Sequence, residues 1–156
     1  MRIFTKNRVS LAAILIFLVL GFGKTEAADN IILKDLNGRS VNFSNYKGRP
    51  AIIFFWTTWC RFCRDEIRGL NQNYNKIEKE GIAVFVVNAS EPEYKVRRFF
   101  KHYTLNFRAF LDEDGLLADK YNIMGVPTYI FLDKSGRVIT KKNILPANYK
   151  SLLLKN

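Results

Sequence analysis

The sequence predicts one α/β domain in which buried strands and helices alternate along the chain. Two wholly apolar runs, at residues 51–56 and 82–87, flank a stretch whose apolar residues recur at helical spacing. Strands without polar alternation are covered on both faces, and two such strands joined by a helix form a right-handed unit with parallel strands. At 156 residues, 48% of them hydrophobic, the chain is long enough for a single domain with one continuous core.

Residues 1–27 form a separate segment with the pattern of an export signal. Basic residues precede the almost unbroken apolar run 9–22, and a small-x-small site ends at Ala27. Such a run suits a signal peptide and is shorter than the roughly 20 residues of a spanning helix. We expect cleavage after Ala27, with an uncleaved inner-membrane anchor as the alternative. Both place the domain, residues 28–156, in the periplasm or otherwise outside the cytoplasm.

The elements of this domain follow from local signals. Residues 31–33 and 41–43 predict a β-hairpin around Asn37-Gly38, because this dipeptide readily takes the positive φ angles of a tight turn. The helix after strand 51–56 is expected to stop at Gly81. The spacing of Ser90 and Glu93 is that of a capping box, which predicts the start of a helix that runs to Tyr103. The remaining elements are predicted in this order: a strand at 107–111, a helix at 116–121, a strand at 129–132, its partner at 137–140 and a helix at 146–154.

The two cysteines, Cys60 and Cys63, lie where the buried strand 51–56 turns into a helix. At a helix N-terminus, unpaired backbone N–H groups and the positive end of the helix dipole favour a thiolate, here that of Cys60. Cys63 lies one turn further along the same face, so it can attack a mixed disulfide formed on Cys60. The pair therefore predicts a dithiol/disulfide switch.

Two other interpretations of the cysteines are weaker. A purely structural disulfide between residues three apart closes too small a loop to restrict the unfolded chain much. A zinc site requires four ligands, and the chain adds to the cysteines only His102, which is distant in the sequence and is predicted to lie on the surface. We expect no metal and no cofactor other than the redox-active disulfide Cys60–Cys63.

Three motifs carry a resemblance to a known family. They are F-W-x-x-W-C-x-x-C at 55–63, Glu66 three residues after the second cysteine, and G-V-P-T at 125–128. With these motifs, residues 29–154 resemble the thioredoxin superfamily, and within it the TlpA/ResA-like exported thiol-disulfide oxidoreductases. The resemblance implies a thioredoxin-like fold: a central mixed β-sheet flanked by helices, with the N-terminal β-hairpin and an inserted helix-strand unit over 90–111 as additions.

The resemblance also implies the roles of individual residues. It suggests that Glu66 is a base near Cys63, the residue that must lose a proton when it resolves a mixed disulfide. It implies a cis peptide before Pro127, which faces the cysteine pair and presents the backbone of Val126 to an extended substrate segment. The implied catalytic residues are Cys60, Cys63 and Glu66, and the implied substrate-binding residues are Trp59, Val126 and Pro127.

We expect an extracytoplasmic thiol-disulfide oxidoreductase that acts on thiols or disulfides of other exported proteins. The resemblance implies a reductase, often of cytochrome c maturation, with a membrane-bound thiol electron donor or acceptor. However, Arg61-Phe62 departs from the family, which more often has proline next to Cys63. Arg61 and Arg64 stabilise the Cys60 thiolate, which favours an oxidising disulfide. A DsbA-like oxidant is therefore one alternative, and a non-catalytic copper- or partner-binding module of the same fold is another.

The net charge of +11 suggests anionic partners but has a simpler explanation. Basic residues are spread from Arg39 to Lys155 without a dense block, which is typical of a solvated surface. Nucleic acid is not an expected partner of an exported protein. We expect a monomer, because no segment of the chain is devoted to dimerisation.

Overall fold

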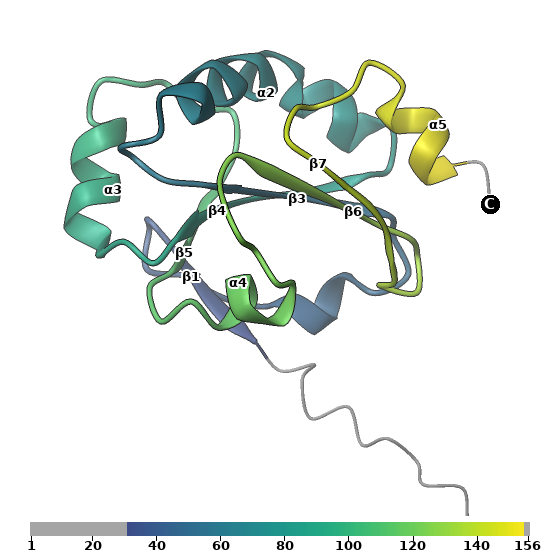
Figure 1. Ribbon diagram of the computed structural model, residues 1–156, viewed down its shortest axis with the longest axis horizontal. Helices are drawn as coiled ribbons and strands as arrows, with labels where there is room; N and C mark the ends of the chain where they lie inside the picture. The colour runs from purple at the N-terminus through teal and green to yellow at the C-terminus, as the bar shows by residue number, and fades with distance from the viewer. Residues whose placement is uncertain (1–30, 155–156) are drawn as a thin grey trace, which may run out of the picture.

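Residues 31–154 of the computed structural model are described here, and they fold around a single mixed β-sheet (Figure 1). Across the seven-stranded sheet the strand order is β2-β1-β5-β4-β3-β6-β7. The strands are β1 (Ile32–Asp35), β2 (Ser40–Asn42), β3 (Ala51–Trp56), β4 (Ala83–Ala89), β5 (Ala109–Asp112), β6 (Thr128–Leu132) and β7 (Val138–Lys142). The helices are η1 (Phe43–Tyr46), α2 (Arg61–Lys79), α3 (Glu93–Phe100), α4 (Leu116–Lys120) and α5 (Tyr149–Leu154).

The predicted export segment, residues 1–27, lies outside the described residues, as do both limits of the predicted domain. Between residues 31 and 154, no helix is both long enough and apolar enough to cross a membrane.

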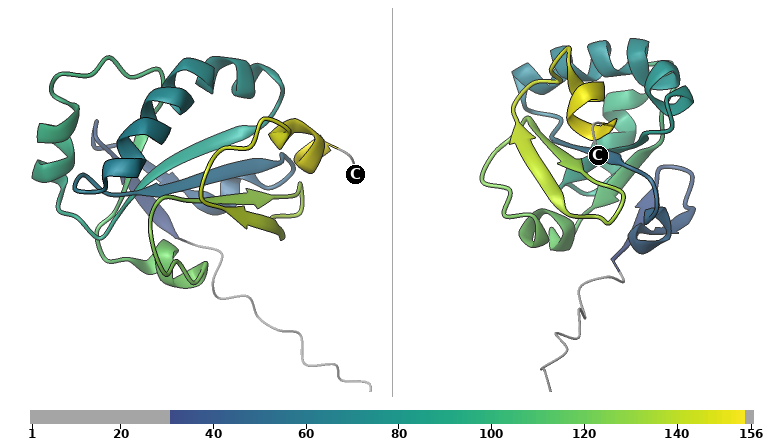
Figure 2. Two further views of the ribbon diagram at one scale, coloured as in Figure 1. Left: turned by 45° about the horizontal axis from the view of Figure 1, so that its top comes forward. Right: turned by 90° about the vertical axis from the view of Figure 1, so that its right-hand side faces the viewer.

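The centre of the sheet is the predicted pair of buried strands, β3 and β4, which run parallel. All residues of β3 are buried, and successive side chains point to opposite faces. Ile52, Phe54 and Trp56 join the core under α2, whereas Ile53 and Phe55 join the core on the other side. Figures 1 and 2 show α2 and α5 on one face of the sheet and α4 with η1 on the opposite face. The carboxyl end of β3 therefore leads directly into α2.

The N-terminal hairpin is confirmed, with Gly38 at φ 75° in its turn. Phe43 begins η1 instead of extending the second strand. β1 also pairs antiparallel with β5, a long-range contact that makes the sheet mixed at this edge as well as at β6. The other predicted elements are present with shifted ends: β5 begins at Ala109 and α5 at Tyr149, both later than expected. Gly81 follows the last turn of α2 with φ 81°, as its predicted role requires.

The predicted capping box at Ser90 and Glu93 is wrong. The N-cap of α3 is Pro92, and Ser90 lies in the preceding loop with φ 55°. The backbone N–H of Glu93 donates instead to the side-chain carboxylate of Glu113, from the loop after β5. The helix also ends at Phe100, before the predicted limit. A partner distant in sequence took the capping role because folding brings the two loops together.

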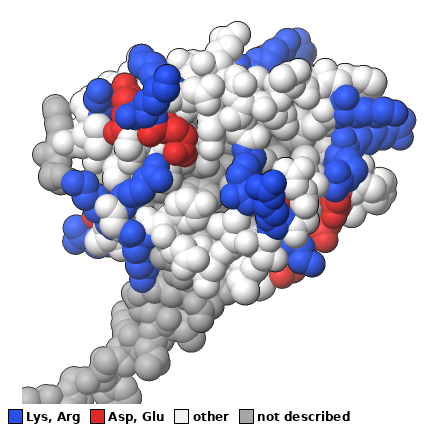
Figure 3. Space-filling view, turned by 180° about the vertical axis from the view of Figure 1, so that it is seen from behind, with Lys and Arg blue, Asp and Glu red and all other residues white. Residues whose placement is uncertain are grey.

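Charged side chains are dispersed on the face seen in Figure 3. Lysine and arginine side chains occur there in small separate groups, some with acidic side chains beside them, and uncharged surface lies between the groups. This distribution agrees with the spread of basic residues along the sequence.

Asp35, at the end of β1, connects the hairpin to the body of the domain. Its side chain is 2% exposed and accepts hydrogen bonds from the backbone N–H groups of Asn37 (2.9 Å) and Arg39 (2.8 Å). The guanidinium of Arg108 pairs with its second oxygen at 2.7 Å. Burial opposes ionisation of Asp35, but the hydrogen bonds and the Arg108 charge outweigh burial and lower the pKa of this carboxyl.

We expect Asp35→Asn to lower the free energy of unfolding at neutral pH by about 1–3 kcal/mol. Because the pKa of the folded state lies below that of the unfolded state, the stabilisation is complete above the unfolded value, near 4, and is lost as the pH falls through the folded value. Urea unfolding between pH 7 and pH 3 should therefore show a steeper loss of stability for the wild type. If the free energy of unfolding falls with pH equally in the wild type and in Asp35→Asn, this expectation is wrong.

Candidate redox site

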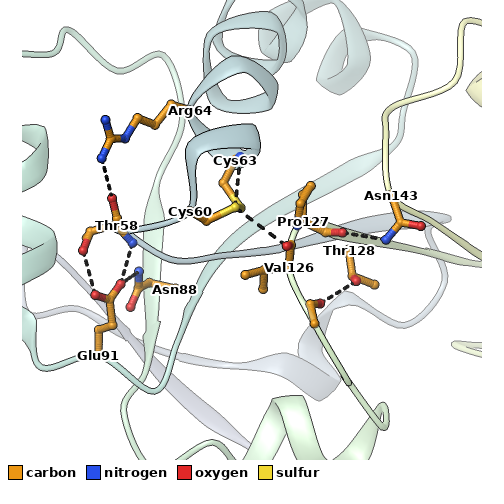
Figure 4. The surroundings of a disulfide bond; sticks show 11 residues. Thr58, Cys60, Cys63, Arg64, Asn88, Glu91, Val126, Pro127, Thr128 and Asn143 are labelled. Carbon is orange, nitrogen blue, oxygen red and sulfur yellow. Dashed lines mark hydrogen bonds between the residues drawn. A yellow bond between two sulfur atoms is a disulfide. The ribbon is translucent and has the colours of Figure 1, made fainter.

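Cys60 is the N-cap residue of α2, and Cys63 lies in the first turn of that helix (Figure 4). The backbone of Cys60 is extended, and its Sγ accepts a hydrogen bond from the N–H of Cys63 at 3.1 Å. The two residues form a disulfide, with their Cα atoms 5.3 Å apart. The predicted position of the pair at a helix N-terminus is confirmed. There the N–H groups of α2 stabilise negative charge on Cys60 when the disulfide opens.

The two sulfurs are unequally accessible. Cys60 is 5% exposed, whereas Cys63 is fully buried under the helix. A substrate sulfur can therefore reach Cys60 first, and Cys63 can react only with a partner already attached to Cys60. This asymmetry assigns the outer position to Cys60 and the inner position to Cys63.

The loop before β6 lies beside the disulfide (Figure 4). The peptide between Val126 and Pro127 is cis, as the resemblance implied, and the carbonyl oxygen of Val126 lies 3.7 Å from Sγ of Cys60. Asn143 holds this loop by donating from Nδ2 to the carbonyl of Pro127 at 2.9 Å. The Thr128 hydroxyl donates to the carbonyl of Gly125 at 2.7 Å (Figure 4). These bonds hold the backbone before Pro127 beside Sγ of Cys60.

Glu66 is half-buried on α2, one turn after Cys63. Its Oε2 accepts a hydrogen bond from the N–H of Leu145 at 3.1 Å. Close to it lies Tyr129, whose ring stacks on that of Phe54 with centroids 4.4 Å apart and whose hydroxyl is buried. Burial raises the pKa of Tyr129, and the negative charge of Glu66 raises it further, so the two side chains are close neighbours. No hydrogen bond joins Glu66 to the disulfide-bonded Cys63 among these residues.

The two tryptophans that precede the cysteine pair are placed differently. Trp56, the last residue of β3, is fully buried and packs against Phe99 and Phe100, with ring centroids 5.1 and 5.0 Å away. Trp59 is 70% exposed and lies immediately before Cys60. Trp56 thus belongs to the core, and only Trp59 is available to a partner.

Sequence reasoning missed Glu91, a carboxylate only 5% exposed in the loop between β4 and α3. It accepts three hydrogen bonds: from the Thr58 N–H at 2.6 Å, the Thr58 hydroxyl at 2.7 Å and the Asn88 amide at 2.8 Å. Arg64 donates to the carbonyl of Thr58 at 3.4 Å, so both backbone polar groups of Thr58 are held (Figure 4). The segment that leads to Cys60 is therefore tied to the neighbouring loop. No local sequence signal marks Glu91, because Thr58, which supplies two of its three hydrogen bonds, is 33 residues away and only the fold brings it near.

Within residues 31–154, no three His, Cys, Asp or Glu side chains lie close enough together to hold a metal ion. His102 is exposed, as the sequence predicted, in the segment that follows α3.

Most of the chain matches one protein-family model. Residues 25–141 match the model of the AhpC/TSA family. The chain belongs to the AhpC/TSA family. Membership in this family, part of the thioredoxin superfamily, confirms the thioredoxin-like fold that the resemblance implied.

Three proteins that are similar to this AhpC/TSA-family chain are named as disulfide or thiol-disulfide oxidoreductases. It is 29% identical over 150 residues to the thiol-disulfide oxidoreductase ResA of Bacillus cereus. This match covers 86% of this chain and 87% of that protein. It is 32% identical over 112 residues to ResA of Bacillus subtilis. This match covers 72% of this chain and 63% of that protein, so the chain spans less than two-thirds of the length of that relative. A crystal structure of a secreted Mycobacterium tuberculosis disulfide oxidoreductase, homologous to E. coli DsbE, matches with a TM-score of 0.65 at 25% identity, over 78% of this chain and 88% of that one.

Proposed function

We propose that this AhpC/TSA-family protein is a thiol-disulfide oxidoreductase that exchanges disulfides with cysteines of other exported proteins. One observation carries the proposal: the disulfide Cys60–Cys63 begins α2, and its outer sulfur lies 3.7 Å from the carbonyl that precedes Pro127. A helix N-terminus stabilises the thiolate, and an accessible backbone edge next to it binds an extended chain. The names of the ResA relatives support the same chemistry.

In the reducing direction, the Cys60 thiolate attacks one sulfur of a substrate disulfide. The substrate S–S bond breaks, and its second sulfur leaves as a thiolate that takes up a proton. The Cys63 thiolate then attacks Sγ of Cys60, which releases the first substrate sulfur and closes the Cys60–Cys63 disulfide. The substrate has gained two electrons and two protons. A dithiol donor at the membrane restores Cys60 and Cys63 by the same exchange in reverse.

Glu66 is the proposed acceptor of the Cys63 proton in the second step. It lies one turn from Cys63 on the same helix and is already partly withdrawn from water. Cys63 is fully buried and belongs to a core cluster of apolar and aromatic side chains that includes Phe54, so the base that takes its proton must come from a neighbouring side chain and not from bulk water. The N–H of Leu145 holds the carboxylate in place.

We expect Glu66→Gln to slow the closure of the Cys60–Cys63 disulfide by about 100-fold, because the proton of Cys63 loses its acceptor. The first attack by Cys60 should keep its rate. The glutamine carbonyl can still accept from Leu145, so the fold is retained. Stopped-flow mixing with a fluorescent mixed disulfide separates the two steps, and equal closure rates in both proteins would contradict the role of Glu66.

The site of action that we propose is outside the cytoplasm. The export pattern of residues 1–27 supports it, and so does the similarity to a secreted disulfide oxidoreductase. The proposed substrates are exported proteins with paired cysteines, including those matured into c-type cytochromes.

The reduction potential of the Cys60–Cys63 couple tests the direction of electron flow. We expect a value at or below about −230 mV in glutathione buffers, which would support a reductase fed by a membrane donor. A value above about −180 mV would mean that Arg61 and Phe62 make the disulfide oxidising, and the reductase assignment would be wrong.

A further inference from the structure

Three large apolar side chains around Cys60 are unusually exposed. Trp59 is 70% exposed, Phe62 72% and Met124 96%. Trp59 and Phe62 lie within two residues of Cys60, and Met124 lies two residues before Val126, whose carbonyl faces the same sulfur. These three side chains form what we call the apolar rim. Exposed apolar groups gathered at one place mark a surface that contacts a partner.

The apolar rim continues into an open groove beside the loop that precedes β6. The groove has a volume of about 450 Å³ and is lined by residues on both sides of Pro127 and by the end of β7, among them Met124, Val126, Thr128, Lys142 and Asn143. Val126 lines the groove, and its carbonyl oxygen lies 3.7 Å from Sγ of Cys60, so the groove lies next to this sulfur. A chain attached to Cys60 can therefore extend along it.

The charges that surround this surface are positive. Arg61 and Arg64 are exposed in the first turn of α2, and Lys142 is exposed at the end of β7. Among the described residues, neither Arg61 nor Lys142 has an ion-pair partner. We call these three residues the basic rim.

The nearest acidic side chains on α2 do not neutralise the basic rim. Asp65 pairs with Arg68, and Glu66 accepts the N–H of Leu145 from a half-buried position. Glu91, the other acidic side chain close to this segment, is 5% exposed and accepts hydrogen bonds from Thr58 and Asn88, so the exposed charge around Cys60 is positive.

We infer that this surface selects extended protein segments in which the reactive cysteine is flanked by an apolar residue and by acidic residues. The inference rests on the redox function proposed above and names the substrate class of that site. The apolar neighbour is desolvated against Trp59, Phe62 and Met124, and the acidic residues pair with the basic rim. An anionic membrane would offer the same charge, but it supplies neither a sulfur for Cys60 nor a backbone N–H for the carbonyl of Val126.

The test compares three short peptides that differ only in charge. Each carries a Leu-Cys pair as a mixed disulfide with 2-mercaptoethanol, and the flanking positions hold glutamate, glutamine or lysine. The dithiol form of the full chain, in neutral detergent, reduces each peptide at low salt, and the reaction is quenched with acid. Each rate is divided by the rate with dithiothreitol, so that the reactivity of the peptide itself cancels.

Two charge-reversal variants accompany the wild type. One carries Arg61→Glu, Arg64→Glu and Lys142→Glu. The control carries Arg39→Glu, Lys79→Glu and Lys134→Glu, which change the net charge equally. The control positions are exposed and lie away from Cys60: in the β1-β2 turn, at the last residue of α2 and in the β6-β7 turn.

For the wild type and the control variant we expect the glutamate peptide to react at least about tenfold faster than the lysine peptide, with the difference shrinking in high salt. The variant of the basic rim should reverse this order. If the basic-rim variant reduces the three peptides in the same order of rates as the wild type, the inference is wrong, although the proposed redox function still stands. Anionic phospholipid vesicles could instead slow the reduction of all three peptides equally in the wild type and leave the basic-rim variant unaffected. That result would assign the basic rim to a membrane. Failure to reduce even the glutamine peptide would overturn the proposed function itself.

Discussion

Replacing Cys63 by serine is expected to turn the protein into a covalent trap for its substrates. Cys60 remains accessible at the start of α2 and still attacks a substrate disulfide, but the buried resolving thiol is gone. Without Cys63, release of the substrate depends on a second thiol from solution, which reacts more slowly than a thiol already held beside Cys60. Mixed disulfides should therefore accumulate and lower turnover by several orders of magnitude. Non-reducing electrophoresis of extracytoplasmic extracts would show them as bands that disappear with dithiothreitol.

The matched control for this experiment is Cys60→Ser, which removes the outer sulfur and keeps the inner one. Since Cys63 is shielded by α2 and by the core, this variant should form no mixed disulfide and show no turnover. Trapping by Cys60→Ser, with none by Cys63→Ser, would reverse the assigned order of the two cysteines.

Glu91→Ala is expected to have the second largest effect, on both stability and reactivity. The change leaves the Thr58 N–H and the Asn88 amide without their acceptor in a nearly closed environment. We expect the free energy of unfolding to fall by about 2–3 kcal/mol. The segment before Cys60 also loses its tie to the β4-α3 loop, so attack by Cys60 on a small disulfide should slow by about tenfold or more.

Two companion variants separate these effects of Glu91. Glu91→Gln should retain most of both properties, because the glutamine oxygen can accept from Thr58 N–H and Asn88 while its amide donates to the Thr58 hydroxyl, which can reverse its role. Asp35→Ala removes another buried carboxylate that accepts backbone N–H groups, at the end of β1, which is separated from β4 by β5. It should lower stability without changing the rate of attack. An equal loss of rate in Asp35→Ala would show that general loosening, and not the tie to Thr58, slows Cys60.

The local part of the site could be predicted from the sequence, because it depends on neighbours in the chain. The apolar run 51–56 indicated a buried strand, and Cys60 and Cys63 followed it at a strand-to-helix junction. Burial pattern and helix-end chemistry are properties of a few consecutive residues, so they can be read without the fold. The cis peptide before Pro127 was different: it followed from resemblance to a family and not from the residues themselves.

The sequence by itself therefore determined the buried parallel strands, the N-terminal hairpin and the redox pair at the start of a helix. Only the tertiary structure decided which distant groups meet that pair. Three contacts join residues that are far apart in the sequence. They are Val126 with Cys60, 66 residues apart, Glu91 with Thr58, 33 apart, and Leu145 with Glu66, 79 apart. The same reason explains the failed capping box, since Glu113 and not Ser90 supplies the acceptor at the start of α3. A polar group can be satisfied by any partner that packing brings within hydrogen-bonding distance, and local sequence does not encode which partner that is.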